Sequence, residues 1–150
     1  MTIEHYLKRV SRAWRRVEMC KRRQVDLFSR ATSPQPATFE SGTKINANGG
    51  AYENTLAALA DAGTETAKAI LDYWEIRTET EMALFKLDNA DEISVLFERY
   101  IEGRKVGEIT AENEDRGGPT SRARINRILN NGKNHLAEIL RADGVDIDVE

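Results

Sequence analysis

The sequence has few of the residues that mark disulfide-bonded, secreted or membrane-spanning proteins. Its 150 residues include one cysteine, Cys20, which excludes a disulfide within the chain and fits a reducing compartment. No apolar run approaches the ~18 residues needed to span a bilayer. The N-terminus is charged from Glu4 onward, unlike a secretory signal. We therefore expect a soluble, cytoplasmic protein without a membrane partner.

Groups of residues that carry catalysis or hold metals are also scarce. The two histidines, His5 and His135, are far apart in the sequence and have no cysteine beside them, so no metal site is expected. Gly132 and Lys133 lack the upstream glycine of a phosphate-binding loop. No nucleophile is recognisably paired with a base. We therefore expect no enzyme and no cofactor.

The charge of the chain is sorted along its length. The net charge is only −3, which by itself favours no class of partner. Residues 1–30 hold nine basic and three acidic side chains, residues 51–98 hold three basic and eleven acidic, and residues 99–142 hold nine basic and six acidic. The last eight residues hold four acids. Such segregation indicates opposed faces or opposed segments.

The N-terminal part is predicted to contain a long basic helix over residues 3–30, which neither glycine nor proline interrupts. Its apolar residues recur at alternating steps of four and three, the seam of a coiled coil. The seam residues are Ile3, Leu7, Val10, Trp14 and Val17. Residues 31–50, with two of the three prolines and no visible period, are predicted to be a mobile tether.

A second long helix is predicted over residues 51–87, and it is acidic where the first is basic. The two helices can pair as an antiparallel hairpin within one chain or can pair between subunits, and the sequence leaves both open. Gly63 weakens the second helix and can mark a close crossing or a bend. Residues 1–87 are thus predicted to be a coiled, self-associating helical element in a homo-oligomer.

The segment 90–103 has the period of one amphipathic helix. Asn89, followed three places later by Glu92, resembles a capping box at its start, and Gly103 is predicted to end it. Its apolar stripe consists of Ile93, Leu96, Phe97, Tyr100 and Ile101.

A short helix over residues 104–112 is predicted next, followed by a charged, glycine-rich turn over residues 112–119 and a basic helix from Thr120 to Leu140. The stretch from Arg116 to Ala137 holds five Lys and Arg side chains and no acidic one. Helix, short helix, turn and basic helix is the order of a helix-turn-helix DNA-binding unit. The predicted fold is therefore all-α, with this unit over residues 88–141 and an acidic tail at 142–150, which we expect to be frayed.

The chain resembles a family of small phage late transcription regulators, the RinA/ArpU-like proteins, whose C-terminal part is similar to region four of sigma-70-type factors. The stretch YLKRVSRAWRRVEM resembles the family's opening coiled helix, and SRARINRI followed by NNGKNHL resembles its recognition helix. Between them, the family's pattern is matched by Leu96, Arg99, Tyr100, Ile101, Glu102, Gly103, Glu108 and Ile109. The resemblance implies a DNA-binding regulator, active in a bacterial host cell, that activates late genes together with host RNA polymerase.

The basic helix carries the residue types that read double-stranded DNA. Arginine grips guanine, asparagine reads adenine, and both bind phosphates, while hydroxyls at a helix start can donate to a phosphate. The predicted DNA-binding residues are Arg116, Thr120, Ser121, Arg122, Arg124, Asn126, Arg127, Asn130 and Lys133. Two alternatives stay open: a small terminase-type DNA-packaging protein, and a polymerase-binding adaptor without DNA affinity.

Overall fold

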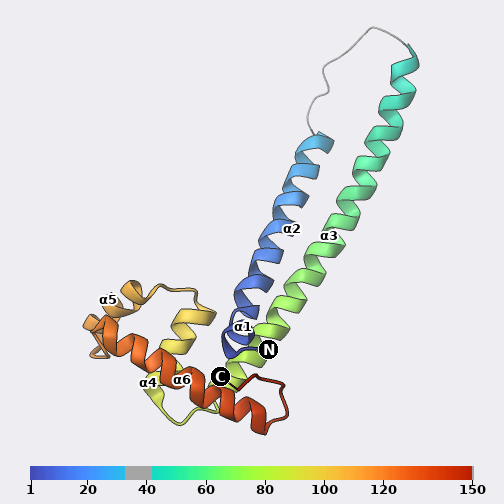
Figure 1. The fold of residues 1–150 in the computed structure, drawn as a ribbon. Helices are drawn as coiled ribbons and strands as arrows, with labels where there is room; N and C mark the ends of the chain where they lie inside the picture. Colours follow the sequence, from blue (N-terminus) through green and yellow to red (C-terminus); the bar gives the residue numbers. More distant parts are fainter. Residues whose placement is uncertain (33–41, 150) are drawn as a thin grey trace. The chain divides into compact units, whose positions relative to one another are not determined.

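The structure, a computed structural model, describes residues 1–32 and 42–149, and the side chains of residues 42–51 are outside this description. All the regular structure in these residues is helical, which confirms the all-α prediction (Figure 1). The elements are α1 (Ile3–Leu7), α2 (Arg9–Thr32), α3 (Gly42–Leu84), α4 (Ala90–Leu96), the π-helical turn η1 (Phe97–Ile101), α5 (Val106–Arg116) and α6 (Arg122–Ala142). Within the described ranges, no helix combines the length and apolar character needed to cross a bilayer.

The two long helices differ in their bounds from the prediction. The first is interrupted once, at Lys8, which separates α1 from α2. The second, α3, begins at Gly42 and not at Ala51. The remainder of the predicted tether, residues 33–41, lies outside the described residues. Contacts divide the chain into two units: one consists of Trp14–Asp72, and the other of Met1–Ala13 together with Tyr73–Glu150.

In the unit Trp14–Asp72, α2 and α3 of the same chain pair with each other. Val17 of α2 and Ala62 of α3 are almost fully buried. Arg23 donates to Glu65 across the pair at 3.1 Å, as the complementary charges of the two helices suggested. Trp14 is not part of the buried seam: it is 43 % exposed, and the Lys21 ammonium lies over its ring.

The other unit packs the two chain ends around one core. Tyr6 and Leu7 from the N-terminus are fully buried, as are Leu84 at the end of α3 and Leu136 in α6. Arg9 and Glu79 form an ion pair at 3.3 Å, so α2 and α3 also lie side by side within this unit. Around the same core, α4, α5 and α6 gather together (Figure 1).

The N-terminus of α4 begins as its sequence predicts. The Asn89 side chain accepts hydrogen bonds from the backbone N–H groups of Asp91 and Glu92, which satisfies two donors that the first helical turn leaves unpaired. After Leu96 the helix widens into η1 and ends before Gly103, whose φ of 71° lies in the left-handed region. The predicted stop at Gly103 therefore has a conformational cause.

Helix α6 crosses α4 closely at Gly132. A Cβ atom at Gly132 would lie 2.9 Å from Leu96 Cδ1 and 3.3 Å from Glu92 Cβ, so α6 has no room for a side chain there. One turn further, His135 Nδ1 lies 2.9 Å from the buried carboxylate of Glu92. The hydrogen bond and the charge of Glu92 raise the pKa of His135. The crossing of α4 and α6 thus combines close packing with an ion pair.

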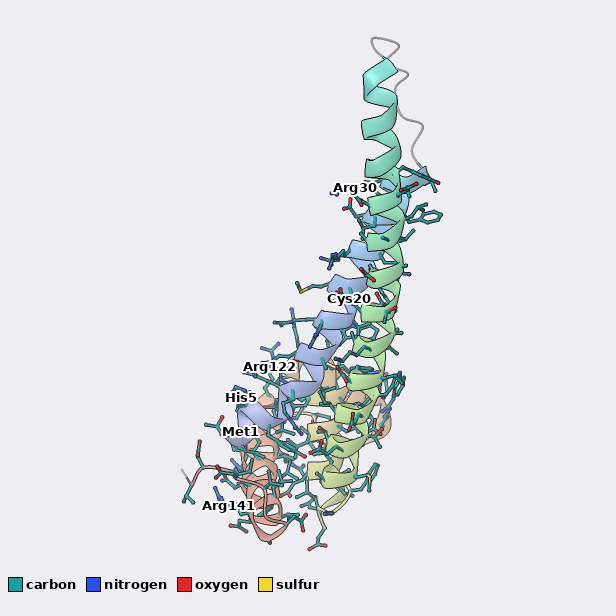
Figure 2. All side chains as sticks on the ribbon, turned by 90° about the vertical axis from the view of Figure 1, so that its right-hand side faces the viewer. Met1, His5, Cys20, Arg30, Arg122 and Arg141 are labelled. Carbon is teal, nitrogen blue, oxygen red and sulfur yellow. The ribbon has the colours of Figure 1, made fainter. Side chains whose placement is uncertain are left out.

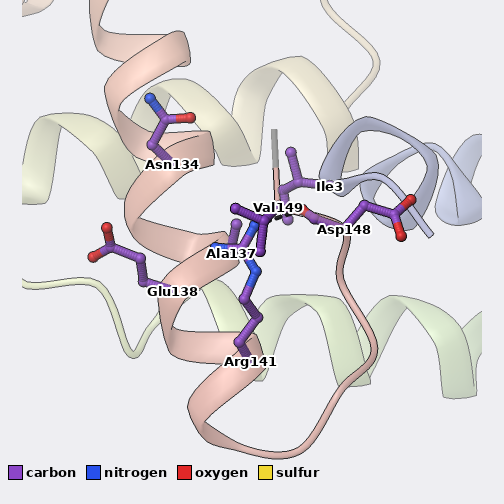
Figure 3. Close-up of a pocket in the computed structure, with 7 residues that line it drawn as sticks. All are labelled: Ile3, Asn134, Ala137, Glu138, Arg141, Asp148 and Val149. Atoms are coloured by element: carbon purple, nitrogen blue, oxygen red, sulfur yellow. Dashed lines mark hydrogen bonds between the residues drawn. The ribbon is translucent and has the colours of Figure 1, made fainter.

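The acidic tail is not frayed, which corrects the prediction. The Arg141 guanidinium donates to the carbonyl oxygens of Ile147 and Asp148, and the Ile147 side chain is 4 % exposed. Figure 3 shows Asp148 and Val149 beside Ile3, around a pocket of about 330 Å³ at the C-terminal end of α6. Sequence reasoning missed the isoleucine in this tail, which supplies the apolar contact that holds it.

Candidate nucleic-acid interface

The turn before α6 is short and is held by a buried asparagine. Residues 112–116, predicted as turn, continue α5, so only Gly117 to Ser121 separate α5 from α6. Gly117 has a φ of 74°, in the left-handed region that ends many helices. Asn113, 6 % exposed, donates from Nδ2 to the Pro119 carbonyl at 2.9 Å, and its own carbonyl accepts from Gly118 N–H. Asn113 therefore fixes the position at which α6 begins.

The start of α6 presents polar groups to solvent. Ser121 is the N-cap, and its hydroxyl accepts a hydrogen bond from Arg124 N–H at 3.4 Å. Thr120, just before it, is exposed. No acidic side chain occurs in the first turn of the helix, so the positive end of its dipole is not offset there. Both predicted hydroxyl residues thus lie where an anion would meet a helix N-terminus.

The two faces of α6 have different roles. One face is buried in the core through Ile125, Leu129, Leu136 and Leu140. The opposite face is exposed, and the structure brings most of the predicted DNA-binding residues together on it. Arg127 lies near the centre of this face, about 180° around the helix from the mean direction of the buried side chains. The other exposed members are Arg124, Asn126 and Asn130.

Arg122, labelled in Figure 2, lies at the edge of the exposed face where α6 meets α5. Its guanidinium is so close to α5 that a Cβ atom on Gly107 would lie 3.0 Å from Arg122 Nη2. Lys105, the exposed N-cap residue of α5, lies two residues before Gly107. Sequence reasoning did not include Lys105 among the site residues, although a lysine directly before a helix start is a signal for a phosphate contact.

The two remaining predicted residues, Arg116 and Lys133, are engaged by carboxylates. Arg116 Nη1 lies 3.5 Å from Glu98, and its Nη2 lies 3.9 Å from Glu112. Lys133 is only partly exposed, and its ammonium lies 3.2 Å from Glu4. The acid-free stretch of the sequence is therefore neutralised at both ends by residues that fold against it.

Glu4 is the centre of the pairing at Lys133. The Tyr100 hydroxyl donates to Glu4 at 2.7 Å. Partial burial raises the pKa of the Glu4 carboxyl, but the hydrogen bond from Tyr100 and the two lysines around it together lower that pKa to about 2. Glu4 thus stays ionised at neutral pH and holds α1 to α6.

Three arginines of α6, Arg122, Arg124 and Arg127, have no ion-pair partner within residues 1–32 and 42–149. Together with the exposed hydroxyls and asparagines of the same helix and its start, they make up a set of polar residues that we call the α6 basic face. This surface consists of Thr120, Ser121, Arg122, Arg124, Asn126, Arg127 and Asn130. No protein-family model, no curated protein and no solved structure matches the chain, so the chemistry of this surface is the basis for assigning a function.

Proposed function

We propose that the chain is a DNA-binding transcription regulator, without enzymatic chemistry, that uses the α6 basic face to bind double-stranded DNA. This proposal rests above all on the two sides of α6: one is buried, and the other exposes three arginines that no carboxylate of the described residues neutralises. Unpaired guanidinium groups on a rigid helix suit phosphates and guanine edges, which accept hydrogen bonds from planar donors.

The arrangement before α6 supports a helix-turn-helix assignment. Helix α4 with η1, then α5, then a short turn held by Asn113, then the basic helix α6 is the expected order of elements. In such units the N-terminal part of the second helix enters the major groove. On this basis Arg127 and Asn130 would face base edges, and Arg122 with the hydroxyls of Thr120 and Ser121 would contact phosphates.

The biological assignment rests on the resemblance to RinA/ArpU-like regulators. We propose a phage or prophage protein that acts in the bacterial cytoplasm as a homo-oligomer, binds promoter DNA and activates late genes with host RNA polymerase. Oligomerisation would increase the low affinity expected of a single unit. A terminase-type packaging protein would instead form a ring of about eight or more subunits, and a polymerase adaptor would show no salt-sensitive DNA binding.

The first experiment measures how binding depends on salt. Three unpaired arginines per chain predict that log K falls against log salt concentration with a slope of about −3 per bound chain. Fluorescence anisotropy with a labelled duplex, titrated at several salt concentrations, gives this slope. Binding that does not depend on salt, or no binding at low salt, contradicts the proposal.

The second experiment separates base reading from phosphate contact. It needs a specific duplex, selected from fragments of the source genome, and a scrambled duplex of equal length. Arg127→Ala should cost about 1–3 kcal/mol on the specific duplex and much less on the scrambled one. Arg122→Ala should weaken both duplexes alike and flatten the salt slope by about one unit. Equal losses on both duplexes for Arg127→Ala would refute the assignment of the reading face.

A matched control is Arg116→Ala. Arg116 already faces Glu98 and Glu112, so its charge is compensated within the fold and its removal should change the salt slope little. A loss as large as that of Arg122→Ala would show that the basic face extends to α5. Circular dichroism should report unchanged helix content for all three variants, because none of these side chains is buried.

A further inference from the structure

Apart from Met19, the large exposed apolar residues of the unit Trp14–Asp72 lie on one side of its helix pair. The opposite side is mainly charged: a cleft there is lined by Arg16, Met19, Cys20 and Arg23 of α2 and by Glu65 and Lys68 of α3. Val25 lies about 160–180° around α2 from these two arginines. Between residues 56 and 71 of α3, five residues lie about 160–240° from Glu65, measured in one sense around the helix. These five residues, which we call the α3 stripe, are Leu56, Ala60, Gly63, Ala67 and Leu71.

Four members of the α3 stripe are exposed, Gly63 is partly exposed, and none is charged. Leu56 is 42 % and Leu71 is 70 % exposed, and on α2 the flanking Val25 and Phe28 are 65 % and 58 % exposed. With Trp14, these side chains expose on the order of 600 Å² of surface, at the upper limit for a patch on a monomer and approaching the ~800 Å² that each partner of a stable interface buries. This unit therefore leaves uncovered an apolar area as large as the largest patches found on monomers.

The order of sizes in the α3 stripe identifies that partner. From Leu56 to Leu71 the stripe reads Leu, Ala, Gly, Ala, Leu, which is the same in both directions about Gly63. An interface with two-fold symmetry joins the same surface of two subunits, so each residue i meets j and each j meets i. In an antiparallel pair centred between Gly63 and Thr64, Leu56 would meet Leu71 of the second copy, and Ala60 would meet its Ala67.

Gly63 supplies a second argument for a close partner. A glycine within a helix is less stable than alanine there, so its presence in the middle of α3 needs a reason. Within the chain, a Cβ atom at Gly63 would meet only Gln24 Nε2, at an ordinary 3.7 Å. The packing of this unit therefore has room for alanine, whereas a second helix that crosses at Gly63 would use the missing side chain to come closer.

We infer that the α3 stripe is the surface through which two copies of this chain associate, as an antiparallel pair with its two-fold axis between Gly63 and Thr64. The inference deepens the self-association part of the proposed function and does not depend on DNA binding. The α3 stripe also takes the place of the N-terminal seam as the surface for self-association. Leu7, Val10 and Val17 of that seam are buried within one chain and are not available to a second copy.

The test measures the mass of the full chain by sedimentation equilibrium at micromolar concentrations, without DNA. The wild type should be a dimer, and Ala67→Glu should raise the dissociation constant by at least about tenfold, because it would place a carboxylate in an apolar contact. Lys68→Glu, on the charged side of the same helical turn, is the matched control and should leave the dimer intact. Helix content by circular dichroism should be unchanged in both variants, because both positions are exposed.

Crosslinking determines the orientation of the pair. In a Cys20→Ser background, chains with Ala60→Cys should form disulfides with chains carrying Ala67→Cys faster than either variant does with itself. A parallel pair would reverse this preference. A monomeric wild type, a dimer that Ala67→Glu leaves intact, or preferred Ala60–Ala60 crosslinks would each overturn the inference. Loss of DNA binding in a protein that remains dimeric would count against the proposed function alone.

Discussion

The turn that places α6 depends on one side chain, and replacing Asn113 by alanine tests this dependence. Asn113 is 6 % exposed, and its amide is the donor to the Pro119 carbonyl at 2.9 Å. Alanine would remove this donor and leave the carbonyl of the buried Pro119 without the hydrogen bond from residue 113. The turn also contains Gly117 and Gly118, and because glycine restricts the backbone little, few other features fix the conformation of the turn.

The expected cost follows from these contacts. A neutral hydrogen bond contributes about 1 kcal/mol net, and leaving a buried acceptor unpaired costs about 1–3 kcal/mol. Asn113→Ala should therefore lower the free energy of unfolding of the unit that contains α6 by about 2 kcal/mol. Glu114→Ala, at the next and exposed position of α5, is the matched control and should change this free energy by less than about 0.5 kcal/mol.

Urea denaturation followed by circular dichroism gives the change in stability. Hydrogen exchange locates it, because the chain consists of two units that can open separately. Exchange should accelerate most at the backbone amides that follow the turn, including Ile125, whose N–H donates to the Ser121 carbonyl at 2.9 Å. A change in stability no larger than that of Glu114→Ala would refute the view that Asn113 holds the turn.

Three further predictions concern the contacts of α6 and α1. The pKa of His135 is raised by Glu92, so the pair stabilises the fold fully at a pH below 6.5, the ordinary pKa of histidine. This contribution is lost as the pH rises through the pKa of His135 in the folded protein. His135→Gln should remove this pH dependence of the urea midpoint. Glu4 should stay ionised down to about pH 2 in an NMR titration, and its contribution to stability, present above 4.5, should be lost as pH falls towards 2. Gly132→Val should destabilise the unit by about 1–3 kcal/mol in urea denaturation, because a Cβ would overlap the buried Leu96; an unchanged midpoint would contradict the close crossing.

The local features of this fold could be predicted from the sequence. The helical period located the segments from residue 90 to 140, and Asn89 and Gly103 marked the ends of the first of them, as the structure confirms. The error at residues 112–116 has a physical reason: glutamate and arginine favour helix, and Glu112 and Arg116 are an i, i+4 pair on one face of α5. The charged residues were interpreted as part of a turn, so the predicted length of α5 was too short.

The contacts between distant residues could not be predicted in this way. The pairing of Lys133 with Glu4 joins residues 129 positions apart, and no local pattern indicates that an acid from the first helix meets the last one. Trp14 has the heptad spacing of a buried residue but is 43 % exposed. The spacing of an apolar stripe along a helix does not determine which edge of the stripe the neighbouring helix covers. The exposure of the predicted residues at the centre of α6 could thus be predicted from the sequence, whereas the carboxylates that face Arg116 and Lys133 could not.

Folding selects which of the basic residues can act on a partner. In the sequence, Arg116 and Lys133 look equivalent to the three arginines between them, since all five belong to one stretch without acids. In the structure, Glu98 and Glu4 face the two outer residues, and neutralised pairs attract a polyanion weakly because their fields cancel. Within this stretch, the basic side chains without a carboxylate partner among the described residues therefore lie in the exposed N-terminal half of α6, where the helix dipole has the same sign. This placement is what would direct a phosphate backbone to one edge of the protein and set the angle at which α6 approaches the bases.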